Sequence, residues 1–194
     1  REGDAIAQIH RFLEMDTVTR IVVVDQGGTL DSLAEFSAML AQHEQLRLVS
    51  QPNLGGSGGY ARGMLEAAGD PGAAVLFSDD DAVLSAESLR RMVTYQALAA
   101  RPTIIGTPLF SSRRPSQLIT HTETVRAEVF QWAAVDRIRG AIDLDGTTPA
   151  DWDFLSPHGQ ANYTGWWGTL FPPGTASELG LPALGGFLFS PAAA

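Results

Sequence analysis

The chain has 194 residues, of which 44% are hydrophobic and 18% charged, which is enough for a real core and too apolar for a disordered chain. Its net charge of −9 argues against nucleic acid as a partner, because phosphate contacts need clustered basic residues. It has no cysteine, and all 13 basic residues are arginine. Disulfides, thiolate metal sites, a cysteine nucleophile and a P-loop lysine are therefore excluded within this chain.

Strands and helices alternate over the first half of the sequence. Apolar residues at helical spacing predict a helix at 4–13, and a β-branched run predicts a buried strand at 21–24. The same reasoning continues along the chain, with a plausible N-cap at Ser85. The further expected helices are 31–40, 57–68 and 87–99, and the further expected strands are 46–49, 73–77 and 103–106. This alternation predicts βαβ units and a mostly parallel sheet.

The character of the sequence changes beyond about residue 108. Strand-like pieces at 117–121 and 128–133 predict a hairpin or edge strands, and a polar loop is expected at 143–160. A short helical turn is expected at 175–179. No stretch of the sequence reaches about 18 apolar residues. We expect no signal peptide, and we expect the sequence to be part of a longer polypeptide.

Polar residues follow three of the predicted strands. Asp25 and Gln26 follow the first strand, Asn53 the second, and the triplet Asp79-Asp80-Asp81 the third. In open parallel sheets, ligands bind at the carboxyl ends of the strands, so we expect the three segments to face one crevice.

The aspartate triplet is the strongest chemical signal. Three adjacent carboxylates repel one another, and a hard divalent cation with its preference for oxygen ligands would relieve that repulsion. The structural alternative is an acidic turn into a helix, with one aspartate near the helix start and the others solvated. Because the triplet follows an apolar strand, we favour metal and diphosphate binding.

A glycine-rich segment at 55–59 opens a predicted helix, whose N-terminal N–H groups favour anions. Ala61 stands where a dinucleotide fingerprint needs glycine, so that match fails. Two interpretations of the segment remain. Its glycines let the backbone come close to a ligand or to a neighbouring strand, or the segment is a flexible surface turn. Arg62 pairs with a phosphate or with the aspartates, or it is an ordinary surface arginine.

Trp166 and Trp167 are adjacent large aromatic residues. In a strand they would point to opposite faces, so at most one would belong to the core. Aromatic faces often form platforms for sugar rings. The alternative is that one tryptophan packs inside and the other covers a loop.

Three segments in this order resemble family-2 glycosyltransferases of the galactofuranosyltransferase type that builds cell-wall galactan. They are QPNLGGSGGYAR at 51–62, FSDDD at 77–81 and YTGWW at 163–167, and VDQG at 24–27 matches the end of a further strand. The resemblance covers about residues 21–181. It implies a GT-A fold, a Rossmann-like α/β/α sandwich with a mostly parallel central sheet, incomplete at both ends. Residues 1–110 would form the nucleotide-sugar-binding part and 111–194 the acceptor-side part of the same domain.

The resemblance also implies roles for individual residues. The ligand of most of them would be the donor, a UDP-sugar such as UDP-galactofuranose. Asp79 and Asp81, in an Asp-x-Asp pattern, would hold a Mn²⁺ or Mg²⁺ ion on the diphosphate, and Trp166 and Trp167 would bind the acceptor sugar. The donor-binding residues would be Asp25, Gln26 and Asn53 around the uracil and ribose, Gly56 and Arg62, and Asp79 and Asp80 near the ribose and diphosphate.

The implied reaction is inverting transfer, in which an acceptor hydroxyl attacks the anomeric carbon with the help of a carboxylate base. The family's Trp-Asp-Asp segment with that base should follow shortly after Leu181, where this sequence has PALGGFLF. We therefore expect the base to lie outside these residues and the fragment alone to be inactive. A polyprenyl-diphosphate-linked glycan acceptor would place the enzyme in the cytoplasm, peripherally at the inner membrane face. Any homo-oligomer would form through parts not present here.

Two alternatives stay open at this point. One is a sugar-nucleotide transferase of another class, such as a rhamnosyltransferase or a polyprenyl-phosphate glycosyltransferase. The other is a non-catalytic carbohydrate-binding module on a degenerate transferase scaffold.

Overall fold

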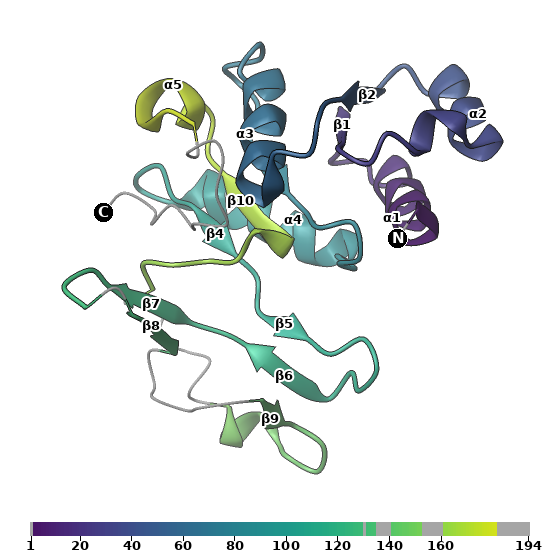
Figure 1. Ribbon diagram of the computed structural model, residues 1–194. Coiled ribbons are helices and arrows are strands. Elements are labelled where there is room, and N and C mark those ends of the chain that lie inside the picture. Colours follow the sequence, from purple (N-terminus) through teal and green to yellow (C-terminus); the bar gives the residue numbers. More distant parts are fainter. Residues whose placement is uncertain (1, 130, 135–140, 153–160, 182–194) are drawn as a thin grey trace. The chain divides into compact units, whose positions relative to one another are not determined.

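The computed structural model describes residues 2–129, 131–134, 141–152 and 161–181 (Figure 1). The chain divides into two compact units. Unit 1 comprises Arg1–Ile104 and Leu170–Ser190, and unit 2 comprises Ile105–Thr169 and Pro191–Ala194. The sequence assigns donor binding to residues 1–110 and acceptor binding to residues 111–194. Both assignments stay predictions, because they depend on bound ligands.

Unit 1 contains the alternating elements that the sequence predicts up to residue 99, together with a strand at 169–171 that it did not predict. Its helices and strands are α1 (Glu2–Leu13), β1 (Ile21–Asp25), α2 (Ala34–Gln42), β2 (Leu46–Ser50), α3 (Gly55–Ala67), β3 (Val75–Phe77), α4 (Ala86–Leu98), β10 (Thr169–Phe171) and α5 (Thr175–Leu179). The structure differs from expectation at two strands and two helix starts. The strands predicted at 73–77 and 103–106 begin only at Val75 and Ile105. A 3₁₀ turn at Leu30–Ser32 precedes α2, and α3 begins at Gly55, inside the glycine segment.

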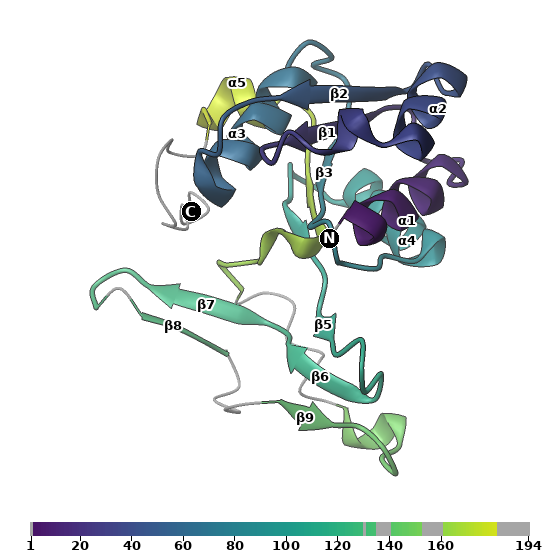
Figure 2. The ribbon, with the colours of Figure 1, turned by 45° about the vertical axis from the view of Figure 1, so that its right-hand side comes forward.

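Strands β1 and β2 are parallel and paired in register from Ile21 opposite Leu46 to Asp25 opposite Ser50. Their carboxyl ends therefore lie at the same edge, as predicted. Figure 2 shows the two strands side by side, with α2 and α3 beside them. Helix α3 packs against both β1 and β3, and β3 pairs with β10. Side chains at the ends of all three predicted strands reach α3, because Gln26, Gln51 and Asp79 hydrogen-bond to residues of this helix.

The hydrophobic core of unit 1 explains why these segments fold as they do. The helical spacing of Ile6 and Ile9 places both on the buried face of α1, and Phe36 of α2 is fully buried. Ser85 caps α4 as predicted, because its hydroxyl accepts the Ser88 N–H at 3.0 Å. The main cluster consists of Ile6, Ile9, Ile21, Leu30, Phe36, Met39 and Leu46, and a second cluster consists of Met15, Leu84 and Leu89.

Unit 2 is built from short, mostly antiparallel strands. They are β4 (Ile105–Gly106), β5 (Leu109–Phe110), β6 (Gln117–Thr120), β7 (Glu123–Arg126), β8 (Gln131–Ala134) and β9 (Ile142–Asp143). β6 lies between β5 and β9, and β7 pairs with β8 in a hairpin. The strand predicted at 128–133 was wrong in its start, because the turn between β7 and β8 includes Val129, whose N–H donates to Arg126 O. The predicted loop at 143–160 contains a 3₁₀ turn at Pro149–Asp151, and 153–160 lies outside the described residues.

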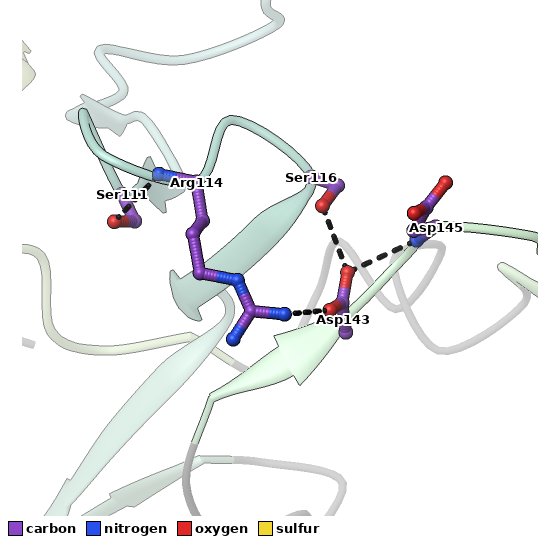
Figure 3. A network of polar contacts seen from close by, with 5 residues as sticks. All are labelled: Ser111, Arg114, Ser116, Asp143 and Asp145. Carbon is purple, nitrogen blue, oxygen red and sulfur yellow. Dashed lines mark hydrogen bonds and ion pairs between the residues drawn. The ribbon is translucent and has the colours of Figure 1, made fainter.

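A polar network ties the turn before β6 to the end of β9 (Figure 3). Arg114 Nη2 lies 2.6 Å from Asp143 Oδ2, while Ser116 Oγ donates to Asp143 Oδ1 at 2.8 Å. The Asp145 N–H donates to the same Oδ1 at 3.1 Å. The Ser116 and Asp145 hydrogen bonds, with the Arg114 charge, hold the pKa of Asp143 below its usual value.

None of the helices in the described part of the chain has the length and apolar composition needed to span a membrane.

Candidate functional site

Asp25, at the end of β1, organises the loop that follows it. Its Oδ1 accepts the N–H groups of Gly27 and Gly28 at 2.8 and 2.9 Å, and its Oδ2 accepts those of Thr29 and Leu30, both at 3.0 Å. Burial alone would raise the pKa of Asp25, but these four backbone donors outweigh it and lower the pKa. Asp25 therefore holds the backbone at this edge, and its expected contact with a nucleotide stays a prediction.

The Gln26 carboxamide joins the end of β1 to the start of α3. Its Nε2 donates to Gly55 O at 3.0 Å, and its Oε1 accepts the Leu54 N–H at 2.9 Å and Gln51 Nε2 at 3.0 Å. Gln51 Nε2 also lies 3.3 Å from Gly58 O. The strand-end glutamines thus hold the glycine segment in place.

The glycine segment is the start of helix α3 and not a surface turn. Asn53 Oδ1 accepts the Gly55 N–H at 2.9 Å, and Gly55 has φ +73°, which favours glycine. A Cβ on Gly58 would lie 2.3 Å from Leu54 Cβ, so Gly58 allows the chain to close on itself. Among the residues that the structure describes, none lies within 4 Å of a Cβ built on Gly56, and Gly56 is exposed. This leaves the backbone at Gly56 open to a ligand.

Arg62 is engaged by a carboxylate of its own helix. Its Nε lies 2.7 Å from Glu66 Oε1, and Arg47 Nη1 of β2 lies 2.9 Å from Glu66 Oε2. The hydrogen bond from Arg62, with the charges of Arg47 and Arg62, lowers the pKa of Glu66. In the structure, Arg62 pairs with Glu66, so its expected place on a phosphate stays a prediction.

The first aspartate of the triplet is held by a tyrosine of α3. The Tyr60 hydroxyl donates to Asp79 Oδ1. The Tyr60 ring packs on Phe77 with a centroid distance of 4.8 Å, and Phe77 packs on Phe171 at 4.7 Å. Burial, then the hydrogen bond and the negative charges of the triplet, raise the pKa of Tyr60, so the phenol stays protonated and acts as a donor.

The backbone before Asp79 has separate supports. Gln8 of α1 is buried, with 4% of its surface exposed, and its Nε2 donates to Ser78 Oγ at 3.3 Å. Ser78 Oγ in turn lies 3.2 Å from Asp79 O, and Arg11 Nη1 donates to Gln8 Oε1 at 3.2 Å. Helices α1 and α3 therefore hold the end of β3 at two different groups, the backbone and the Asp79 carboxylate.

The triplet supplies oxygen donors of the kind that Mg²⁺ and Mn²⁺ prefer. Asp79 is half-buried, whereas Asp80 and Asp81 are exposed. Among the residues that the structure describes, no three acidic or histidine side chains form a ready metal cluster. Magnesium commonly takes only one or two protein carboxylates together with substrate phosphates. The residues thus fit an ion that arrives with a nucleotide.

Trp166 and Trp167 belong to unit 2. They begin a 3₁₀ helix, Trp166–Gly168, in which neighbouring side chains are about 120° apart rather than on opposite faces. Trp167 Nε1 donates to Thr107 O at 3.3 Å, and a Cβ on Gly165 would lie 1.9 Å from the Trp167 ring. Both tryptophans are half-buried, and their acceptor role stays a prediction.

Sequence reasoning missed three residues that organise this edge. Gln51 and Tyr60 stand inside the segment that carried the resemblance, but they received no role. A tyrosine among glycines was the available signal for Tyr60, because a large ring in a glycine-rich helix start must pack on something. Gln8 gave no signal, since one polar residue in an amphipathic helix resembles any surface position.

Comparison with known proteins identifies the family. The profile described as Glycosyl transferase family 2 matches residues 4–153. The chain is 32% identical over 171 residues to galactofuranosyltransferase GlfT2 of Mycobacterium tuberculosis, covering 84% of this chain and 26% of that protein. It is 29% identical over 177 residues to GlfT2 of Mycolicibacterium smegmatis, covering 86% of this chain and 27% of that protein.

The chain thus spans about a quarter of the length of the curated relatives it matches. The family has the GT-A fold, and the alternation of helices with a parallel strand pair agrees with it. The expected α/β fold class is therefore confirmed. Since the profile covers most of its length, the chain belongs to glycosyltransferase family 2.

Proposed function

We propose that the chain is the donor-binding portion of an enzyme that transfers galactofuranose from UDP-galactofuranose to a glycan acceptor of the cell-wall galactan type. The observation that carries this proposal is the similarity to two galactofuranosyltransferases over more than four-fifths of the chain. The arrangement of unit 1 supports it, because α3 links the ends of β1, β2 and β3 through Gln26, Gln51 and Tyr60. Ligands of parallel α/β sheets bind at such an edge.

In this proposal the donor nucleotide lies along the edge formed by β1, β2 and β3. Gln26, next to the loop that Asp25 holds, and Asn53, after β2, flank the uracil and ribose, with Asp25 beside them. The diphosphate lies at the start of α3, where the first N–H groups of the helix and the open backbone at Gly56 favour an anion. Arg62 adds a positive charge nearly two helical turns further along α3.

Asp79 and Asp81 are the residues that would hold Mn²⁺ or Mg²⁺, with Asp80 near the ribose and diphosphate. Such an ion supplies Lewis-acid neutralisation of the charge on the departing UDP. The protein positions the diphosphate at α3 and fixes the Asp79 carboxylate through Tyr60. An acceptor hydroxyl then attacks the anomeric carbon from the opposite face while a carboxylate base takes its proton, so the configuration inverts.

Trp166 and Trp167 would provide the surface for the acceptor sugar, since aromatic faces stack on sugar rings. The acceptor is a glycan, and a polyprenyl-diphosphate anchor would bring the enzyme to the inner face of the membrane as a peripheral protein.

A thermal-shift measurement with UDP and Mn²⁺ tests the donor site. We expect UDP with Mn²⁺ to raise the Tm of the wild-type protein, since a ligand that binds only the folded state stabilises it. Asp81→Ala should abolish the metal-dependent rise and leave the Tm without ligand unchanged, because Asp81 is exposed. Asp70→Ala, which removes another exposed aspartate of unit 1, is the matched control and should behave as wild type.

No Tm rise of the wild-type protein with UDP and Mn²⁺ would contradict the proposal. A panel of nucleotide sugars with the full-length protein then tests the sugar. Transfer from a rhamnose donor with none from UDP-galactofuranose would favour a rhamnosyltransferase. UDP binding without transfer to any glycan would favour the non-catalytic module.

A further inference from the structure

Tyr60 is the residue of the glycine-rich segment whose side chain reaches the aspartate triplet. It follows Gly59 directly and belongs to α3, the helix whose start Gln26 and Gln51 hold. Its hydroxyl donates to Asp79 Oδ1. One side chain therefore links the proposed diphosphate-binding helix start to the proposed metal-binding carboxylate.

The Tyr60 side chain is itself fixed by packing. Its ring lies 4.8 Å from the Phe77 ring, and Phe77 lies 4.7 Å from the Phe171 ring. Phe77 is the last residue of β3, two positions before Asp79. A phenol held by aromatic contacts presents its hydroxyl in one direction, so the position of Asp79 Oδ1 is set by α3 as well as by its own strand.

The contact leaves Asp79 able to bind a ligand. An ionised carboxylate has about four acceptor sites on its two oxygens, and the Tyr60 hydroxyl occupies one of them at Oδ1. The backbone at Asp79 is held separately by Ser78 and Gln8. Removing the Tyr60 hydroxyl should thus free the Asp79 carboxylate to rotate without displacing the strand end.

We propose that Tyr60 is a positioning residue, which holds the Asp79 carboxylate in the orientation that binds the cation of the metal–nucleotide complex. This inference rests on the proposed function. It assigns to Tyr60 the coupling between the glycine segment and the metal site, so that donor and cation bind as one unit.

The test compares the full-length wild-type protein with Tyr60→Phe, which keeps the ring and removes only the hydroxyl. UDP affinity is measured by calorimetry in saturating Mn²⁺ and in EDTA, and the Mn²⁺ concentration for half-maximal binding is measured at fixed UDP. In Mn²⁺ we expect the Kd for UDP to rise about tenfold, the size of a lost hydrogen bond to a charged group. In EDTA the Kd should change less than about twofold.

Tyr95→Phe is the matched control, because Tyr95 is an exposed tyrosine of α4, and it should leave both affinities unchanged. Tyr60→Leu, which also removes the ring, tests packing and should lower the Tm, whereas Tyr60→Phe should melt close to wild type. If Tyr60 acts through packing alone, Tyr60→Phe should weaken UDP binding by the same factor with and without metal.

Three results would overturn the inference. They are an unchanged Kd in Mn²⁺ for Tyr60→Phe, an equal loss in Mn²⁺ and EDTA, and an unchanged Mn²⁺ half-saturation. Each of these leaves the proposed function standing as long as the wild-type protein binds UDP in a metal-dependent way. A wild-type protein without metal-dependent UDP binding overturns the proposed function, and this inference with it.

Discussion

The ends of β1 and β3 both carry aspartates, but the protein engages them differently. Asp25 after β1 is 7% exposed, and each of its oxygens accepts two backbone N–H groups. After β3, Asp79 is half-buried and accepts a side-chain hydroxyl, while Asp80 and Asp81 are exposed. The same residue type thus stabilises a loop at one strand end and remains accessible at the other. A carboxylate at the end of a strand can therefore serve the loop that follows it, whatever else it contacts.

The largest expected effect is the loss of stability when the Asp25 carboxylate is removed. Asp25→Ala leaves four N–H groups of the Gly27–Leu30 loop without their acceptor, and hydrogen bonds to charged groups contribute about 1.5–3 kcal/mol each without being additive. We expect the free energy of unfolding, measured in urea, to fall by about 3 kcal/mol. Asp31→Ala, an exposed aspartate nearby, should cost less than about 0.5 kcal/mol.

An equal fall in the free energy of unfolding for Asp25→Ala and Asp31→Ala would show that the Asp25 carboxylate does not stabilise the loop. The loop would then hold its shape without the carboxylate, and contact with the nucleotide would be the remaining role proposed for Asp25.

The glycine segment allows the next test, because Gly56 and Gly58 lie in one helix and differ in their surroundings. A methyl group on Gly58 meets Leu54 Cβ at 2.3 Å, so Gly58→Ala should lower the free energy of unfolding by about 1–3 kcal/mol. Gly56→Ala meets open space and adds a better helix former, so stability should stay equal or rise by up to about 1 kcal/mol.

UDP binding completes this test. If the diphosphate approaches the backbone at Gly56, as we propose, Gly56→Ala should weaken UDP binding in Mn²⁺ while the protein stays stable. Unchanged UDP affinity for Gly56→Ala would place the diphosphate elsewhere along α3.

Much of this architecture could be predicted from sequence because its helices and strands follow from local patterns of apolar and capping residues. The β-branched run at β1, the helical spacing of Ile6 and Ile9, and the Ser85 cap each depend on neighbours close in the chain. The start of α3 was harder, since glycine has low helix propensity. In the structure, Gln26 and Asn53 hold that helix start from outside the helix.

The details of the site depend on contacts between distant segments, and these leave little trace in local sequence. The four N–H groups on Asp25 require the loop to fold back at Gly28, which has φ +66°. The Tyr60 contact spans 19 residues and the Gln8 contact spans 70. For the tryptophan pair the sequence left open whether one ring packs inside and the other covers a loop. In the structure both are half-buried, and Gly165 allows the Trp167 ring to lie close to the backbone at the start of a 3₁₀ helix.

The smallest expected effect is a pH dependence that belongs to Asp25 alone. The pKa of Asp25 in the folded protein lies below its usual 3.8, because four backbone donors outweigh burial. The unfolded chain therefore binds the proton more readily. Asp25 contributes its whole stabilisation above its unfolded pKa, and this contribution is lost as the pH falls through the folded pKa.

Asp25→Asn, which has no carboxyl group to titrate at this position, tests this pH dependence. Other acidic groups titrate in both proteins and cancel in the difference. The stability advantage of wild type over Asp25→Asn, measured in urea, should thus be largest near pH 6 and narrow below pH 3.8; an advantage independent of pH would mean that the Asp25 charge does not stabilise the loop.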